Sequence, residues 1–416
     1  MLKKDFYQIL PVIILAFAIA LSPSFSAGEI EGGRIIEIRV EDILIVILGL
    51  LWIASFLISG RKKIEKPPLF FPILAWLSIG LISVLTNWIF ANITLSGGFF
   101  FFLKEIQFFL LYFYLFYHLK TIDSIKFIVK AWIFLGLVNV GWIIYEMIRG
   151  LKLTYYYGPT LFIEPEGTLP GGGFLLVIFI FLFNILLFYY LSQKISNFKK
   201  GILIVTIISL IIGIYASGSR ASFFGLIFAL FLTFLFYSIR KGFLKTFLIG
   251  VFVSIFLISI FVFLEKPLIK RYFSLEDFLW NLNPENPVSR PGIWVSRLSE
   301  ASKYPLFFLF GLGKSVFGES HSQYVRNFIE TGIVGSLIFL FLMFIILKKA
   351  WQGFSRVKNP LLIGLSSGLF VATLTLLFIS ISAEAFIVVK ISEVYWFFVA
   401  LTMVALNPNQ TKSFYA

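Results

Sequence analysis

The chain has 416 residues, of which 59% are hydrophobic and only 13% are charged, and its formal net charge is +14. Soluble domains carry about a quarter charged residues, so this composition predicts a protein that crosses a membrane several times. Because the chain has no cysteine, disulfide frameworks, thiolate metal sites and cysteine nucleophiles are excluded.

Apolar segments follow one another along most of the chain, and a helix needs about 20 apolar residues to span the hydrocarbon core. We therefore predict an all-α polytopic membrane protein with about 12 transmembrane helices. The expected spans are 7–26, 41–59, 69–88, 99–118, 125–148, 172–192, 201–216, 220–238, 245–264, 328–347, 361–381 and 385–405. This divides the chain into spans one to nine over 1–264, a polar loop over 265–327, and the last three spans with a tail over 328–416.

Basic residues indicate the orientation, because loops rich in Lys and Arg stay in the cytoplasm. They gather in alternate loops, such as 61–66, 194–200 and 240–245, while the loops between them hold few. We expect both termini to be cytoplasmic and the 265–327 loop to face outward. This asymmetry explains most of the net charge, so we expect membrane lipids as partners and no nucleic acid. The first span resembles a secretory signal in part, and we expect it to remain an uncleaved helix because so many spans follow.

The segment SGSRAS places Arg220 where a span begins on the expected outer side. Ser219 or Ser217 can cap that helix, yet a cation in its first turn opposes the helix dipole. One interpretation is an arginine that extends from a helix end to the membrane interface. We favour the other, an anion site in which the guanidinium and the helix N-terminal amides bind a phosphate.

The outer loop carries PVSRPGIW, in which Pro287 and Pro291 bracket Arg290. We expect irregular backbone at the prolines and a short amphipathic helix starting at Trp294. Arg290 is interpreted equally well as a surface residue and as an anion ligand. Arg297 follows seven residues later, and it shares a helix face with Arg290 only if the helix begins before Pro291, so we rank it second.

His321 is the one histidine on the expected outer side, since His118 ends the fourth span at the inner side. A lone histidine is commonly structural, but a neutral imidazole can also accept a proton near neutral pH. Glu319, Glu330 and Tyr324 lie close to His321 in the sequence and can orient it.

Charged residues within the spans need partners, because burying them costs free energy. Lys104 and Glu105 lie inside the fourth span, and they either contact an acceptor or pair with Glu146 or Glu384. We favour structural pairing. Glu384 lies in a very short outer turn, where it can orient an acceptor or a catalytic histidine.

Taken together, these segments resemble the O-antigen ligase and polymerase superfamily. The resemblance rests on SGSRAS at a span start, SRPGIW in a long outer loop, FGLG at 310–313, His321, and an E-x-G-[IV]-x-G pattern at 330–335. It covers residues 200–340 in detail and the layout of about 12 spans overall, whereas the first 200 residues match only in style.

The resemblance implies a GT-C-like glycosyltransferase fold, with a long periplasmic loop that contains short helices, in a bacterial inner membrane. Such ligases transfer a glycan from undecaprenyl diphosphate to a sugar hydroxyl of lipid A-core, with no metal ion, cofactor or nucleotide sugar. On this chain, Arg220 and Arg290 resemble the arginines that hold the donor diphosphate, and His321 resembles the general base. The remaining candidate substrate-binding residues are Arg297, Tyr324, Glu330, Ser219, Lys104 and Glu384.

Three alternatives stay open beside the ligase. A polymerase of the same superfamily extends another lipid-linked glycan, and a protein O-oligosaccharyltransferase uses a protein acceptor. A glycan flippase would place cations deep along a central cavity, whereas this chain concentrates its unusual residues at one face and shows no internal repeat. We prefer the ligase because a histidine accompanies SRPGIW. The glycan, the acceptor sugar and the oligomeric state are left open.

Overall fold

The computed structural model describes residues 3–22, 24–30, 34–58, 66–90, 95–148, 171–190, 197–216, 219–241, 289–304, 306–314 and 320–407. In chain order, the elements are α1 (Lys3–Leu21), β1 (Ser24–Ile30), β2 (Arg34–Arg39), α2 (Val40–Ile58), α3 (Phe70–Phe90), α4 (Leu95–His118), α5 (Ile122–Ile148), α6 (Gly171–Ile185), the π-helix η1 (Leu186–Tyr190), α7 (Asn197–Ala216), α8 (Arg220–Lys241), α12 (Arg290–Ala301), α13 (Phe307–Phe310), α14 (Gln323–Arg356), α15 (Pro360–Ile379) and α16 (Val389–Ala405).

Each predicted span within the described residues overlaps a helix, although the span predicted at 7–26 runs past the end of α1 into β1. The span predicted at 245–264 lies outside the described residues. Seven helices of the described part are long and apolar enough to cross a membrane. Shorter apolar helices occupy Ile9–Leu21 and Gly201–Tyr215. The fold is therefore compatible with the predicted polytopic, helical membrane protein.

One element departs from the all-α prediction, an antiparallel hairpin between α1 and α2. Its strands pair from Ser24 with Arg39 to Ile30 with Arg34. Within the segment RIIEIR of β2, residues 36–39 alternate between apolar and polar, as in a strand. This run is too short to be recognised as a strand beside the long apolar segments. The backbone N–H of Arg39 donates to Asp42 Oδ2 at 2.8 Å, so the hairpin leads directly into α2.

The core of the bundle is formed where α6, α15 and α16 pack together, and α16 is buried on all sides, as expected of a helix that is apolar all round. Small residues let α15 approach α6: an added Cβ at Gly364 would lie 2.9 Å from Ile185 Cα, and one at Gly368 would lie 2.9 Å from the Phe181 ring. The Phe181 ring in turn stacks on Phe398 of α16, with centroids 4.2 Å apart.

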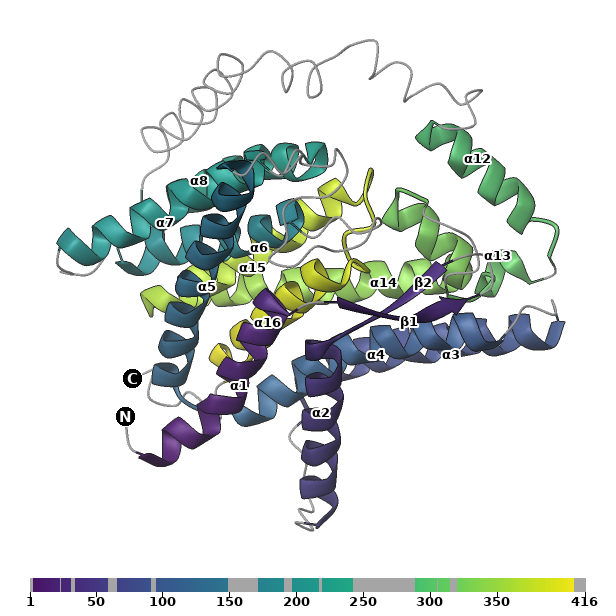
Figure 1. Cartoon of the computed structure of the whole chain (residues 1–416), viewed down its shortest axis with the longest axis horizontal. Helices are drawn as coiled ribbons and strands as arrows, with labels where there is room; N and C mark the ends of the chain where they lie inside the picture. Colours follow the sequence, from purple (N-terminus) through teal and green to yellow (C-terminus); the bar gives the residue numbers. More distant parts are fainter. Residues whose placement is uncertain are drawn as a thin grey trace.

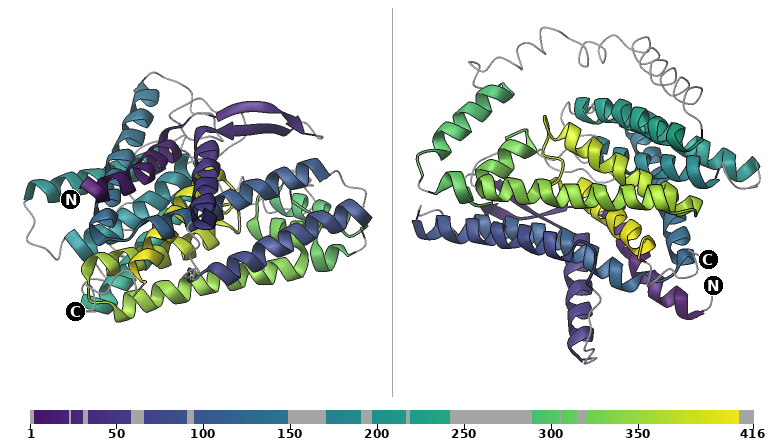
Figure 2. Two further views of the ribbon diagram at one scale, coloured as in Figure 1. Left: turned by 90° about the horizontal axis from the view of Figure 1, so that it is seen from below. Right: turned by 180° about the vertical axis from the view of Figure 1, so that it is seen from behind.

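Figures 1 and 2 show α3 and α4 running alongside α14, with α7 and α8 on the other side of α15. The short helices α12 and α13 lie beside the start of α14, at the right in Figure 1. We call this end of the bundle the α12 end. The described part of the predicted outer loop thus holds two short helices, as expected.

The first and last described helices meet near the loop between α15 and α16. Lys390 Nζ, in the first turn of α16, donates a hydrogen bond of 2.7 Å to the Ile19 carbonyl near the end of α1. It also forms an ion pair of 2.8 Å with Glu41 at the start of α2. These bonds join the end of α1, the start of α2 and the start of α16.

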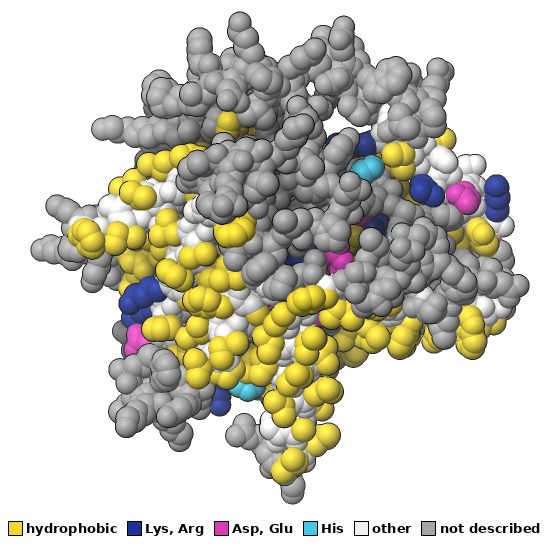
Figure 3. All heavy atoms as spheres, viewed as in Figure 1, with side chains coloured by type: hydrophobic (Ala, Val, Ile, Leu, Met, Phe, Trp, Pro, Cys, Tyr) yellow, Lys and Arg dark blue, Asp and Glu magenta, His cyan; other side chains and the backbone are white. Residues whose placement is uncertain are grey.

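Apolar side chains cover much of the surface seen in Figure 3, most clearly over α2, which projects away from the bundle in Figure 1. Leu50 and Leu51 of α2 are each 60% exposed. Such a surface is unfavourable in water and suited to lipid.

Candidate functional site

The α12 end is built around a close contact between the backbones at Gly311 and Gly332. Gly311 follows α13 with φ +71°, and Gly332 interrupts α14 with φ +65° and ψ −166°. An added Cβ at Gly311 would lie 2.3 Å from the Glu330 carbonyl carbon, and one at Gly332 would lie 2.3 Å from that of Leu309. Only glycine fits at either position. The FGLG and ETGIVG motifs of the sequence therefore form a single contact.

The interruption of α14 also provides hydrogen-bond acceptors. In an unbroken helix, each carbonyl accepts from the amide four residues later. Here the Leu312 N–H donates to the Ile329 carbonyl at 2.7 Å, and the Gly313 N–H donates to the Glu330 carbonyl at 3.0 Å. The segment after α13 thus bonds to two carbonyls of α14 that lie just before the break at Gly332.

Two polar residues of α3 complete this contact. The Ser83 hydroxyl donates to the Glu330 carbonyl at 2.5 Å and accepts from the Gly313 N–H at 2.9 Å. One turn later, Asn87 Nδ2 donates to the Gly311 carbonyl at 2.8 Å. These bonds fix α3, α13 and α14 relative to one another.

A chain of buried charges crosses the same region, and Arg326 stands at its centre. Its Nε lies 2.7 Å from Glu330 Oε1, and its Nη1 lies 2.5 Å from Glu384 Oε2. All three side chains are at most 10% exposed. Two charge-assisted bonds from one planar guanidinium join α14 to the turn between α15 and α16.

Lys314 extends the chain of charges to α3 and α4. Its Nζ lies 2.9 Å from Glu105 Oε2 and 3.5 Å from Glu330 Oε2. Trp76 packs against this pair, since its Nε1 donates to Glu105 Oε1 at 2.7 Å and its ring centroid lies 4.6 Å from the ammonium. We call Glu105, Lys314, Glu330, Arg326 and Glu384 the charge network.

Lys104 and Glu105 form ion pairs within the protein, in line with structural pairing, but with partners other than Glu384. The side chain of Glu146, the other expected partner, lies outside the described residues. Lys104 pairs with Asp42 at the start of α2, and Glu105 pairs with Lys314. The sequence could not reveal these partners, because they depend on how α2 and the segment after α13 pack against α4. Glu330 likewise pairs within the protein. A role of these residues in binding substrate stays a prediction.

His321 lies just before α14, at the α12 end, and its side chain is partly exposed. Its φ of +54° is unusual for a residue with a side chain and is held by neighbouring contacts. Ser320 donates to Glu384 Oε1 from its N–H at 2.5 Å and from its hydroxyl at 2.7 Å. On the other side, the Gln323 N–H donates to the carbonyls of Ser380 and Ala383, at 3.0 and 3.1 Å. The turn between α15 and α16 therefore fixes the backbone that carries His321.

The Glu384 carboxyl gives this region a predicted pH dependence. Burial raises its pKa, but Arg326 and the hydrogen bonds from Ser320 lower the pKa more, so the net value lies below the ordinary 4.5. A carboxyl group whose pKa is lower in the folded state than in the unfolded state stabilises the fold at any pH above its unfolded-state pKa. This stabilisation is lost as the pH falls through the folded-state pKa. We expect the melting temperature of the wild-type protein to exceed that of Glu384→Gln at neutral pH, and the difference to shrink below about pH 4.5. Thermal unfolding of both proteins in detergent, from neutral pH to below about pH 4.5, measures this difference in melting temperature. A difference that does not change with pH would contradict the prediction.

The helix α12 begins at Arg290, four residues earlier than predicted. Ser289 caps it by accepting a 3.1 Å hydrogen bond from the Gly292 N–H. Pro291 lies in the first turn, where its missing N–H costs nothing and its fixed φ favours the helix. Because the helix includes Arg290, Arg297 lies two turns along on the same face. Arg290 is exposed, and Arg297 lies 4.0 Å from Glu300 on the surface.

A hydrogen bond joins this arginine-bearing helix to the backbone at His321. Trp294 Nε1 donates to the carbonyl of Ser320 at 2.7 Å. The PVSRPGIW segment and the histidine therefore meet in space, although 26 residues separate the bonded pair in the chain.

The helix α8 begins at Arg220, as predicted, and Ser219 caps it by accepting a 3.3 Å hydrogen bond from the Ser222 N–H. The side chain of Arg220 lies outside the described residues. An added Cβ at Gly225, in the second turn, would lie 2.9 Å from Ile379 at the end of α15. The start of α8 is thus at the α12 end, the same end as His321.

Tyr324 donates from its hydroxyl to the Leu377 carbonyl of α15 at 2.7 Å, so its hydroxyl has a partner within the protein. The described residues include no group of three or more His, Asp or Glu side chains arranged to hold a metal ion.

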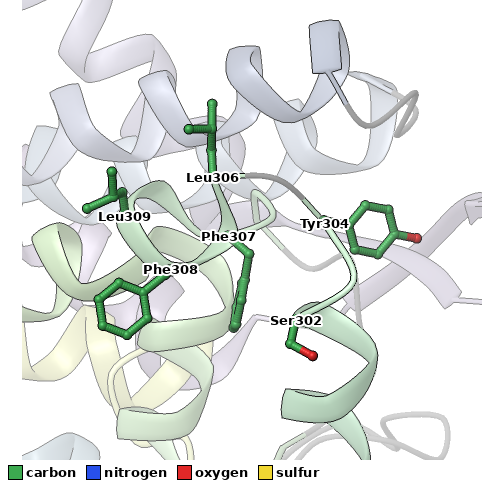
Figure 4. Close-up of a pocket in the computed structure, with 6 residues that line it drawn as sticks. All are labelled: Ser302, Tyr304, Leu306, Phe307, Phe308 and Leu309. Carbon is green, nitrogen blue, oxygen red and sulfur yellow. The ribbon is translucent and has the colours of Figure 1, made fainter.

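An open hollow of about 420 Å³ lies between the end of α12 and α13 (Figure 4). Phe307 and Phe308 line it from α13, and Ser302 and Tyr304 line it from the segment after α12. Leu306 precedes α13 with φ +65° and is 45% exposed. The hollow is mostly apolar and follows the C-terminal end of α12.

Several residues of this region were not foreseen, chiefly Arg326, Lys314, Trp294 and Ser83. Arg326 precedes Glu330 by four residues, which is the spacing of an intrahelical ion pair and could have indicated it. Lys314 follows FGLG directly. Trp294 and Ser83 carry no signal in the sequence, because each acts through a backbone carbonyl of a distant segment.

Comparison with known proteins leaves the chain without a match, since no protein-family model and no curated protein matches its sequence.

Proposed function

We propose that this chain is a lipid-linked glycan transferase, and specifically an O-antigen ligase. It would act at the periplasmic face of a bacterial inner membrane, with about 12 spans in a GT-C-like arrangement and cytoplasmic termini. The observation that carries the proposal is the meeting of PVSRPGIW, FGLG, His321 and ETGIVG at the α12 end. The family resemblance rests on these segments and on SGSRAS. The FGLG segment bonds to ETGIVG, and PVSRPGIW bonds to the backbone at His321.

In this reaction, His321 removes the proton from the acceptor sugar hydroxyl while the hydroxyl oxygen attacks the anomeric carbon of the glycan. The bond from that carbon to the diphosphate breaks, and undecaprenyl diphosphate leaves with the bonding electrons. Arg220 and Arg290 neutralise the charge that grows on the leaving group. Attack opposite the leaving group inverts the anomeric configuration.

The apolar hollow beside α13 supports a lipid-linked donor. Phe307, Phe308 and Leu306 offer an isoprenoid chain an apolar surface, and the same segment continues from α12, which carries Arg290 and Arg297. Lipid A-core is the acceptor we propose, and membrane lipids surround the bundle.

A polymerase and a protein O-oligosaccharyltransferase would use the same donor site and differ in the acceptor. A flippase is less well supported, because the charge network and the Lys390 pair with Glu41 both lie near one end of the bundle. A carrier would need cations along a path through the membrane.

The test is a metal-free assay in vesicles with purified protein and undecaprenyl-diphosphate-linked glycan, offering lipid A-core beside a second lipid-linked glycan. We expect glycan on lipid A-core, and a fall of about 10²–10⁴-fold in rate for His321→Ala, the range typical of a lost general base.

The matched control is His118→Ala, which removes the chain's other histidine. His118 ends α4 and stacks on Tyr114, with centroids 4.0 Å apart, and it should leave transfer near the wild-type rate. Extension of the second glycan alone would show a polymerase. Wild-type activity in His321→Ala would refute the general base.

A further inference from the structure

The helix α12 is attached differently at its two ends. Its C-terminal end is anchored by Ala301, which is fully buried in an apolar cluster with Phe307, Leu312 and Ile329. Towards its N-terminal end, Val295 is 59% exposed, and the hydrogen bond from Trp294 to Ser320 joins the helix to the His321 segment. The anchored end is therefore tied to the FGLG and ETGIVG contact, and a polar link joins the end that carries Arg290 to the His321 segment.

The hydrogen bond from Trp294 connects the helix that carries Arg290 to the backbone of His321, and both residues have a role in the proposed reaction. Trp294 follows Arg290 by four residues, so both lie on one face of α12, one turn apart. The carbonyl that accepts the bond belongs to Ser320, and it forms the peptide bond to His321. Glu384 holds Ser320 from the opposite direction, through both its N–H and its hydroxyl.

Glu384 thus holds the Ser320–His321 peptide, which accepts the bond from Trp294. The helix α12, which carries the donor Trp294, is exposed along one side. An indole N–H is a donor only, and here it has one acceptor at a short distance. Its position fixes how far the first turn of α12 stands from the backbone of His321. Ser289, the other polar residue without charge in the described part of this motif, accepts the capping bond from the Gly292 N–H.

We propose that Trp294 is a positioning residue, whose bond to the Ser320 carbonyl sets the separation between Arg290 and His321. This inference rests on the proposed function, in which Arg290 holds the donor diphosphate and His321 receives the acceptor proton. In-line transfer needs both groups aligned on one anomeric carbon, and an error of about 1 Å in such alignment can cost roughly 100-fold in rate.

The test is Trp294→Phe, which keeps an aromatic ring and removes the N–H. We expect the kcat of glycan transfer to fall by about 10–100-fold, with the KM for lipid A-core nearly unchanged. Trp294→His, which restores a ring N–H, should recover part of the loss. The control is Trp88→Phe, because Trp88 is a half-exposed indole on α3, and it should transfer at the wild-type rate.

A double-mutant comparison separates positioning from a general loss of stability. If Trp294 acts through Arg290, then adding Trp294→Phe to Arg290→Ala should slow transfer little further. Independent losses that multiply, or a wild-type kcat in Trp294→Phe, would overturn the proposal.

A distance measurement tests the link without any assay of transfer. The chain has no cysteine, so spin labels can be attached at Ser296→Cys on α12 and Ile381→Cys in the turn after α15, both exposed positions. We expect a narrow distance distribution in this doubly labelled protein and a broad one after Trp294→Phe. Equal distributions would show that Trp294 does not fix the helix. If the labels respond but the wild-type protein transfers no glycan, the proposed function fails while the link itself stands.

Discussion

Replacing Gly332 with alanine should destabilise the fold and greatly lower the yield of folded protein. The φ and ψ at Gly332 belong to a region that only glycine adopts readily, and the new Cβ would lie 2.3 Å from the carbonyl carbon of Leu309. Backbone strain and overpacking together should cost roughly 2–5 kcal/mol of folding free energy. Thermal unfolding in detergent, together with the yield of monodisperse protein, measures the loss.

Gly201→Ala is the matched control, because an added Cβ at Gly201 meets no atom within 4 Å and the residue lies in the helix α7. There, alanine should be neutral or stabilise by up to about 1 kcal/mol. Equal melting temperatures for Gly332→Ala and Gly201→Ala would show that the backbone contact with Leu309 is not rigid. Gly311→Ala probes the opposite side of the contact and should behave like Gly332→Ala.

Placement of the helices could be predicted from the sequence, since long apolar runs can satisfy their backbone only as helices within lipid. The start of α12 was not predicted correctly, because we interpreted Pro291 as a residue that breaks a helix. A proline in the first turn is instead favourable, and Ser289 supplies the cap. The same local pattern fits both interpretations until the backbone is known.

Within the candidate site, the sequence indicated the segments but not the bonds between them. Gly332 was recognisable as part of a motif. The position requires glycine because the backbone of Leu309, in another helix, leaves no room for a side chain. Similarly, Glu384 was expected to orient an acceptor or a histidine, and in the structure it is bonded to Ser320 and Arg326. Its effect on His321 is therefore exerted through the backbone. Partners of this kind depend on tertiary packing, which a single sequence does not display.

Loss of Arg326 should have the second large effect on stability. Its guanidinium lies between the carboxylates of Glu330 and Glu384, and all three groups are nearly inaccessible to solvent. Arg326→Ala would leave Glu384 without the guanidinium at 2.5 Å and would remove the 2.7 Å partner of Glu330, which also lies 3.5 Å from Lys314 Nζ. Removing one partner of a buried pair typically costs about 3–5 kcal/mol, because the remaining charge is uncompensated. Thermal unfolding in detergent at neutral pH checks this value.

The same reasoning predicts a partial rescue. In Arg326→Met combined with Glu384→Gln, a buried cation and a buried carboxylate are removed together, so less uncompensated charge remains than in Arg326→Ala. The double variant should therefore melt at a higher temperature than Arg326→Ala. As a control, Lys126→Ala breaks the exposed pair with Asp123 and should cost less than about 1 kcal/mol. If Arg326→Ala melted like Lys126→Ala, the charge network would not hold the turn after α15, and the backbone at His321 would need another support.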